Sequence, residues 1–513
     1  MKQPAHAAVL ATPALTNNPA ARAFYSAAIL CLLLAANVSL AQQSAPQETP
    51  QQELQRLKQA VDQTQAQVEA SQQQLVELKR SLAALEQRLA KGDQADSASA
   101  APLTPSPVTA PSPAKVDDLR ERQAMQENQI ATLDQSKVES ESRYPVKIDG
   151  LLLFNGFVNT SQVDVASAPS LAIAGGGSTG ASVRQTVLGI DARGPRLAGA
   201  ASHADLRVDF FGSATGNTGQ SSYADVGGLL RLRTAHATLD WNNTQAFVEL
   251  DRPIISPTSP TSLVAVAEPA LAWSGNLWAW SPQIGITQTM ALGSSHLAVE
   301  AALIDVPDPP LSPGATTTNT VSQAEHSRWP GGELHLGLMG KENGVGPVIG
   351  VGGYFSPHET AGGLRYNAWA ATLDLNLPLP MSFEVSGSLY RGAALGGLGG
   401  GAYKDYLFAA GKALSLDDVG GWAQLKKHAG SRLEFNAAFG MDNAFSSQLR
   451  EYIGSSSTGY QNLARNQTFF ANTIYSPSAY LLFSLEVRHI VTTPVTGTPA
   501  TSNINGIAAG YKF

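Results

Sequence analysis

The nine residues HADLRVDFF, at positions 203–211, decide the fold class of this chain, because polar and apolar side chains alternate through them. Every even position from 204 to 210 is apolar, and every odd position from 203 to 209 is polar. Successive side chains of a β-strand point to opposite faces, so this stretch predicts a strand with one apolar and one polar face. Positions 244–251 and 432–439 repeat the pattern. Between Leu230 and Trp241 the alternation changes phase near Ala235, which indicates a β-bulge or a shifted register.

Breaks in this pattern divide the chain after Pro145 into about sixteen runs of roughly ten residues. Short turn signals occur near 242–243, 293–295, 341–344, 378–380, 428–430 and 476–478, and Asn343-Gly344 is the strongest of them. Longer connections occur near 161–182, 213–229, 252–281, 306–331, 356–363, 392–418, 442–464 and 492–504. Short turns at one end and long loops at the other are typical of outer-membrane β-barrels. We therefore expect residues 144–513 to form an all-β transmembrane barrel of about 16 antiparallel strands, with the C-terminus on the periplasmic side.

The composition agrees with such a barrel and argues against several other classes of protein. Only 15% of the 513 residues are charged, 47 residues are glycine and one is cysteine. Beyond Ala41 no run of 18 apolar residues occurs, so helical membrane spans are not expected. The formal net charge of −7 argues against nucleic acid as a partner, because that role needs a clustered basic face.

The first 41 residues predict a secretory signal peptide. The only charged side chains before an apolar core at 24–38 are the basic Lys2 and Arg22, and small residues follow at 39 and 41. An N-terminal membrane anchor is the alternative interpretation, although the apolar core is short for a bilayer span. The only cysteine, Cys31, would leave with this segment, so we expect no disulfide and no thiolate metal site in the mature chain.

A linker at 42–52 leads to a heptad repeat at 53–91, which predicts an α-helical coiled coil in the periplasm. The apolar core positions of this repeat are Leu54, Leu57, Val61, Val68, Leu75, Leu78, Leu82, Leu85 and Leu89. Such a stripe favours self-association over a single solvated helix, but it does not choose between a dimer and a trimer. Residues 92–114 form a Pro-rich linker, and 115–143 predict a second, weaker helix.

Charged residues on the predicted strands are candidates for the inner wall. A lipid-facing arginine near the bilayer midplane would cost about 2–4 kcal/mol, so Arg207, Arg231 and Arg233 should point into the lumen. The acidic residues on the polar faces nearby are Asp209, Glu249 and Asp251. Acidic and basic groups that face each other across a constriction would make passage depend on solute charge. The alternative is that these charges only pair with one another and hydrate the wall.

The last strand carries a resemblance to a known family. Ile507, Ala509, Tyr511 and Phe513 form one apolar face that ends in an aromatic residue. In this the chain resembles bacterial porins, in which barrel-assembly machinery recognises such a strand. The order of signal peptide, heptads, Pro-rich linker and barrel resembles trimeric porins of the DcaP type or the phosphate-selective O/P type. The resemblance implies a homotrimeric channel in the outer membrane, through which small hydrophilic solutes diffuse passively.

The third long connection, about 30 residues at 252–281, is longer and more apolar than a typical loop. In porins the third loop folds into the barrel and narrows it. The resemblance therefore implies that Glu268, Trp273, Trp278 and Trp280 lie at or near a constriction. The tryptophans would then either contact a sugar or aromatic solute or simply pin the loop to the wall.

Other chemistry finds little support in the sequence. The histidines are scattered without metal-ligand spacing, no GxSxG motif occurs, and we expect no catalytic residue, cofactor or metal site. The glycine-rich run at 396–401 lacks the lysine of a phosphate loop and predicts a flexible outer loop. The competing hypothesis is a barrel that anchors or adheres, carries a periplasmic coiled-coil rod and transports nothing. The apolar third loop favours the channel, and the solute and ion preference stay open.

Overall fold

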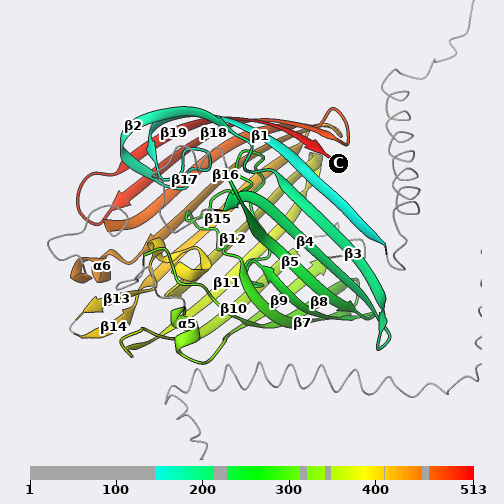
Figure 1. The fold of residues 1–513 in the computed structure, drawn as a ribbon, viewed down its shortest axis with the longest axis horizontal. Helices are drawn as coiled ribbons and strands as arrows, with labels where there is room; N and C mark the ends of the chain where they lie inside the picture. The colour runs from blue at the N-terminus through cyan, green and yellow to red at the C-terminus, as the bar shows by residue number, and fades with distance from the viewer. Residues whose placement is uncertain (1–144, 213–227, 312–320, 341–347, 410, 453–461) are drawn as a thin grey trace, which may run out of the picture. The chain divides into compact units, whose positions relative to one another are not determined.

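Most of the described chain forms one large antiparallel sheet, as the alternation of polar and apolar residues predicts (Figure 1). This computed structural model describes residues 145–212, 228–311, 321–340, 348–409, 411–452 and 462–513. The predicted signal peptide, linkers, coiled coil and second helix, all within 1–143, lie outside the described residues. None of the described helices has both the length and the hydropathy of a membrane span.

The wall of the sheet consists of strands between 8 and 18 residues long. They are β1 Val146–Val163, β2 Ala172–Ser182, β3 Val187–Leu197, β4 Ala200–Gly212, β5 Leu229–Asp240, β6 Thr244–Asp251, β7 Ser281–Leu292, β8 Ser295–Ile304, β9 Gly331–Gly340, β10 Val348–Glu359, β11 Arg365–Leu379, β12 Phe383–Ala393, β15 Asp417–His428, β16 Leu433–Ala444, β17 Leu463–Tyr475, β18 Leu481–Pro494 and β19 Ala500–Lys512. The smaller elements lie in the connections: α5 Gln323–His326, η1 Pro380–Ser382, η2 Gly396–Leu398, η3 Gly401–Tyr403, β13 Tyr406–Ala409, β14 Lys412–Ser415 and α6 Ser446–Tyr452.

The sheet closes into a barrel through β1. One edge of β1 pairs antiparallel with β19, from Leu151 opposite Lys512 to Asn159 opposite Ile504. The other edge pairs with both β2 and β3, which are the two halves of one wall strand interrupted at 183–186. The 17 strands of the sheet therefore correspond to 16 strands of the described wall, because β2 and β3 count once. This confirms the predicted closed antiparallel barrel and its strand number.

The two faces of the wall differ as the alternation predicts. Leu206 on β4, Val248 on β6 and Leu485 on β18 point outward and are 36–66% exposed. Asp209 on β4 and Glu486 on β18 point inward and are at most 3% exposed. The barrel thus has an apolar exterior and a polar, charged interior, as barrels that sit in lipid do.

The last strand presents its aromatic end to the outside. Ile507, Tyr511 and Phe513 are each about half exposed on the outward face, and Ala509 lies between them. The amide of Phe513 donates to the carbonyl oxygen of Gly150, and the Gly150 amide donates back, so the last residue also pairs with β1. The predicted shared face is therefore present, while its recognition by assembly machinery stays a prediction.

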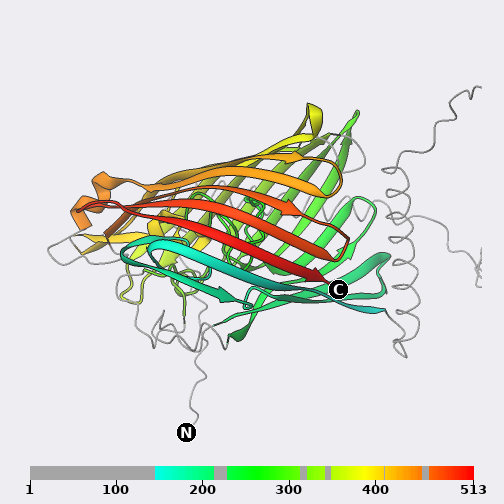
Figure 2. The same cartoon turned by 90° about the horizontal axis from the view of Figure 1, so that it is seen from above.

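The connections sort into two ends of the barrel, which we call the turn end and the loop end. The turn end holds the short connections at 198–199, 241–243, 293–294, 380–382, 429–432 and 476–480. Figure 1 shows α5, α6 and the β13–β14 hairpin at the loop end, opposite the C-terminus, and Figure 2 shows the same arrangement from above. The connections predicted to be long near 356–363 and 492–504 are short, at 360–364 and 495–499, because the strands on either side extend into them. The expected alternation of short and long connections is therefore observed only in part.

Several predicted boundaries were wrong in detail. The first connection is 164–171 rather than 161–182, because the glycine-rich residues 172–182 form β2 despite their low strand propensity. The turn at 198–199 carried no recognised signal, although Ala198 and Gly199 both adopt positive φ. The predicted phase change in β5 is real: the β4–β5 register shifts where Arg207 and Val208 face Thr234 and Leu232.

Two connections fold into the barrel and form much of its core: 252–280, called loop 3, and 394–416, called loop 6. The glycine-rich run at 396–401 lies in loop 6 and is buried, so the prediction of a flexible outer loop was wrong. The physical reason is close packing, because a Cβ on Gly399 would lie 2.7 Å from the ring of Trp278 in loop 3. Gly399 also has a φ of 101°, a left-handed conformation that favours glycine.

Candidate functional site

Loop 3 leaves the wall after β6, returns at β7 and crosses the interior between them. The carbonyl oxygen of Ile255 accepts a hydrogen bond from Thr372 on β11. The amide of Thr261 donates to Gln424 on β15, and the carbonyl oxygen of Leu263 accepts from Asn155 on β1. These strands lie around the barrel from β6 and β7, so loop 3 spans the lumen.

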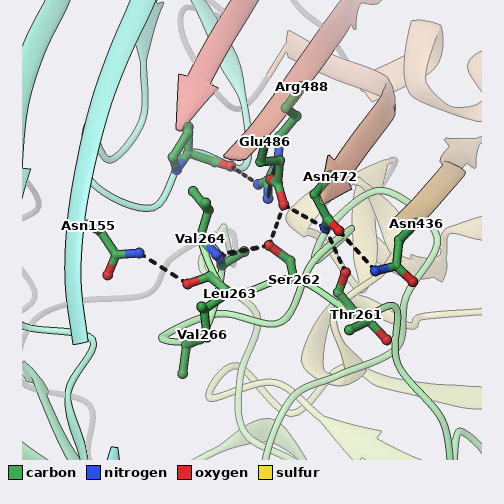
Figure 3. A network of polar contacts seen from close by, with 12 residues as sticks. Asn155, Thr261, Ser262, Leu263, Val264, Val266, Asn436, Asn472, Glu486 and Arg488 are labelled. Atoms are coloured by element: carbon green, nitrogen blue, oxygen red, sulfur yellow. Dashed lines mark hydrogen bonds and ion pairs between the residues drawn. The ribbon is translucent and has the colours of Figure 1, made fainter. Parts of the chain in front are cut away.

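A buried ion pair holds the middle of loop 3 against β17 and β18 (Figure 3). Arg488 donates to one carboxylate oxygen of Glu486 at 2.6 Å, and these side chains are 6% and 1% exposed. The other oxygen of Glu486 accepts from Ser262 of loop 3 and from Asn472. Asn472 also donates to the carbonyl oxygen of Thr261 at 2.9 Å. Buried charges need such partners, so the network fixes the loop at one place.

Gln185 binds the next part of loop 3 from the break between β2 and β3. Its side-chain oxygen accepts hydrogen bonds from the amides of Val266 and Ala267. Its side-chain nitrogen donates to the carbonyl oxygens of Ser167 and Val264. All four hydrogen-bonding positions of this fully buried amide are used, two of each kind. The interruption in the wall strand therefore serves to hold loop 3.

Three of the predicted charges meet where β4 and β5 face loop 3. Asp209 is fully buried, and its carboxylate accepts from Arg231 at 2.7 and 3.1 Å and from Arg233 at 3.0 Å. Arg231 also donates to the carbonyl oxygen of Ala267 at 2.6 Å, and Arg233 donates to that of Val266 at 2.7 Å. Both arginines thus pair with an acid and bind the backbone of loop 3.

The three predicted tryptophans occupy different environments. Trp273 and Trp278 are each 8% exposed, and the ring of Trp273 stacks on Tyr403 of loop 6 with centroids 3.9 Å apart. Trp280 is less buried, and the guanidinium groups of Arg231 and Arg233 lie 5.0 and 4.8 Å from its ring centroid. Trp273 and Trp278 therefore pack loop 3 against loop 6, while Trp280 packs against Arg231 and Arg233.

Glu268 lies in loop 3 beside Arg488 and Thr468. Burial raises the pKa of its carboxyl group to about 8. The nearby Asp164 also raises this pKa, and Arg231 lowers it by a smaller amount. Within the described chain this carboxyl group accepts no hydrogen bond from another residue. Burial therefore favours the neutral, protonated form of the Glu268 carboxyl group.

Arg207 stands apart from the other two predicted arginines, nearer the turn end. One of its nitrogens donates to both carboxylate oxygens of Asp191, at 3.0 and 3.1 Å, and lies 3.6 Å from Asp149. The six predicted strand charges therefore fall into separate groups instead of facing each other as one ring.

Two histidines bridge carboxylates across the inner wall. His236 on β5 lies 2.9 Å from Asp205 and 3.0 Å from Asp251, with Glu249 at 3.9 Å. With both carboxylates ionised, both ring nitrogens donate, and this arrangement favours the protonated imidazolium. The predicted acids Glu249 and Asp251 therefore belong to this histidine group.

The second bridging histidine is His335 on β9. Its ring lies 2.9 Å from Glu300 on β8 and 2.8 Å from Asp374 on β11. Sequence reasoning missed both bridging histidines, Gln185 and the Glu486–Arg488 pair. The available signal was a charged or histidine side chain at an inward position of an alternating strand, but strand register decides the partners.

Comparisons with known proteins agree with the barrel. No protein-family model and no curated protein matches the sequence. The outer membrane channel DcaP of Acinetobacter baumannii has a similar fold, with a TM-score of 0.56 and 16% identity over 73% of this chain and 99% of that chain. An anion-selective porin from Comamonas acidovorans aligns with a TM-score of 0.46 and 9% identity over 72% of this chain and 100% of that chain. The described chain thus forms a 16-stranded barrel whose fold is similar to that of the channel DcaP.

Proposed function

We propose that this protein is an outer-membrane porin, which lets small hydrophilic solutes diffuse passively through a barrel narrowed by loop 3. The observation that carries the proposal is loop 3 itself, which is held across a polar lumen by buried ion pairs and hydrogen bonds. A barrel that only anchors a rod has no need of a loop fixed inside it.

The lining of the narrowed lumen follows from the contacts of the inner wall. Arg231, Arg233 and Trp280 form its basic and aromatic part, with Asp209 as their buried partner. The remaining predicted lining residues are Arg207, Glu249, Asp251 and Glu268, with Trp273 and Trp278 supporting the loop. Most of these charged side chains pair with one another. Such pairs hydrate the wall, and their charges also lie where a passing solute would meet them.

Self-association into a homotrimer is part of the proposal. The outward face of β1, β18 and β19 carries polar side chains at Thr160, His489 and Asn503, and the His489 ring lies 2.8 Å from the Asn503 side-chain oxygen. Polar groups turned toward hydrocarbon are costly, which favours a second copy of this chain over lipid at this face. The predicted coiled coil at 53–91 would associate in the periplasm, and Ile507–Phe513 would carry the assembly signal.

Conductance in a planar lipid bilayer tests the proposal. The full chain, refolded in detergent and added at low concentration, should give discrete current steps in symmetric salt. A correctly folded barrel that produces no steps would identify an anchor or adhesin instead. Heat-dependent mobility on a gel provides the control for folding.

A further inference from the structure

Three side chains of the kinds that bind metals meet on the inner wall near the turn end, beside the predicted lining residue Arg207. Asp191 on β3 lies directly opposite Asp205 on β4, and His203 precedes Asp205 by two positions on the same face. One ring nitrogen and one oxygen from each carboxylate lie within 4.8 Å of one another. The strand register thus gathers three residues that the sequence separates.

The spacing of these groups suits a shared ion better than direct contact. Nε2 of His203 lies 4.0 Å from Asp191, and the other ring nitrogen, Nδ1, lies 4.0 Å from Asp205, both beyond hydrogen-bond distance. An ion shared by the three residues needs a turn of the ring that brings one nitrogen toward both carboxylates. Ligand atoms around a tetrahedral ion, with metal–ligand bonds of about 2.1 Å, stand about 3.4 Å apart. Small side-chain movements would therefore close the site. Neither ring nitrogen of His203 has a hydrogen-bond partner among the described residues.

Hydrogen-bond partners already fix the orientation of the two carboxylates. Asp205 accepts from His236 through one oxygen at 2.9 Å, and its other oxygen is the one that faces His203. Asp191 accepts from one nitrogen of Arg207 through both oxygens, and its carboxylate also shares a hydrogen bond with the carboxyl group of Asp149. Partners of this kind fix the orientation of metal ligands in proteins.

The local charge and accessibility also favour a cation. Five acidic side chains gather here, those of Asp149, Asp191, Asp205, Glu249 and Asp251. They stand against four basic ones, those of Lys147, Arg207, His236 and Arg252, so the acidic groups are in excess by one. The side chains of His203, Asp191 and Asp205 are 36%, 25% and 16% exposed, so an ion can reach them from water. A water molecule can take the fourth position, as in open zinc sites.

We infer that Asp191, His203 and Asp205 bind one divalent transition-metal ion, with Zn²⁺ as the probe. An imidazole nitrogen with two carboxylate oxygens suits Zn²⁺, whereas Ca²⁺ and Mg²⁺ prefer oxygen ligands alone. The site stands on the inner wall, so a bound ion would add positive charge to the lumen near the turn end.

Isothermal titration calorimetry tests the site. The full chain, refolded in detergent without a polyhistidine tag, is titrated with ZnCl₂ and separately with CaCl₂. We expect one Zn²⁺ per chain, at least about tenfold weaker binding in His203→Gln, and Ca²⁺ binding that His203→Gln leaves unchanged. His296→Gln, on β8 next to the turn at 293–294, is the matched control and should bind as the wild type does.

A second variant keeps the test decisive if His203→Gln does not fold. Asp205→Asn should also weaken Zn²⁺ binding, since it removes the charge of a ligand oxygen. Zn²⁺ binding that neither variant weakens, or the absence of Zn²⁺ binding to the folded wild type, would overturn the inference. Calorimetry does not require an open pore. Its result therefore says nothing about conductance, and the two proposals can fail separately.

Discussion

Asp209 illustrates how a single buried carboxylate organises the inner wall. It neutralises Arg231 and Arg233, and both arginines donate to carbonyl oxygens of loop 3. Without Asp209 the two guanidinium groups would repel each other in a partly dehydrated place, and the loop would lose its attachment to β5. The same carboxylate thus governs both wall stability and loop position.

Asp209→Asn should therefore destabilise the barrel by roughly 3 kcal/mol, within the range for a buried pair that loses one partner. Urea unfolding of the refolded protein, followed by tryptophan fluorescence, measures the change. Glu359→Gln is the matched control, because its partner Arg365 has a side chain that is 72% exposed. That surface pair should contribute well under about 1 kcal/mol. Equal effects of the two substitutions would contradict this assignment.

At the scale of elements, loops 3 and 6 support each other inside the barrel. The amides of Trp278 and Ala279 in loop 3 both donate to the carbonyl oxygen of Leu398 in loop 6. Lys404 of loop 6 is 1% exposed and donates to the carbonyl oxygens of Ala402 and Leu463. The core inside the barrel is therefore formed by loops 3 and 6 packed against each other, and neither loop forms it alone.

Gly399→Ala should open loop 6, because the added Cβ meets Trp278 and the left-handed backbone disfavours alanine. The expected result is rapid trypsin cleavage after Lys404, a bond that the wild-type barrel protects by burial. Gly176→Ala provides the control, since a Cβ there meets no atom within 4 Å. Protection of Lys404 in both variants would show that loop 6 does not depend on this contact.

Loop 6 should also respond to pH through Asp405. Burial raises the pKa of this carboxyl group to about 8, so between pH 5 and 7 it is protonated in the closed loop and ionised when the loop opens. The closed loop then binds more protons, and its stability falls as pH rises, by at most about 1.4 kcal/mol per pH unit. Burial lowers the pKa of Lys404 to about 7. Lys404 therefore makes the closed loop more stable as pH rises, but only above about pH 7.

Hydrogen exchange of loop 6 peptides, corrected for the intrinsic rate at each pH, measures this response. Exchange should increase from pH 5 to 7 in the wild type, and Asp405→Asn should remove most of the increase. A wild-type loop whose opening does not change over this window would refute the role of Asp405.

At the scale of the whole molecule, the outward face of the barrel divides into apolar and polar regions. Leu485 and Ile507 on β18 and β19 are apolar and exposed, whereas His489 and Asn503 on the same strands are polar. In a proposed homotrimer the polar region lies against another copy, and the apolar region meets lipid.

Asn503→Leu should weaken the trimer, because the larger apolar side chain removes the contact with His489 and favours lipid at this face. The fraction of trimer on a semi-native gel, followed with rising temperature, measures the change. Ile507→Leu, on the same face of the same strand, should leave the melting of the trimer unaltered. A trimer that is equally stable in both variants would place the interface elsewhere.

The sequence by itself determined the parts of this protein that depend on local pattern. Side-chain alternation and turn residues are local, so they predicted the strand number and the inward and outward faces. The apolar face at Ile507–Phe513 was visible for the same reason. The interior course of the third loop was expected only from the resemblance to porins. Where the local signal was weak, as in glycine-rich β2 and the glycine-rich run of loop 6, the predictions failed.

Only the tertiary structure decided which side chains meet. Asp209 with its two arginines, His236 between two acids, and His203 between Asp191 and Asp205 all depend on strand register. The pattern within β5 indicated a register shift, but which residue faces which also depends on the partner strand and the turn between them. The burial of loop 6 depends likewise on a surface of loop 3 that forms only after the barrel closes.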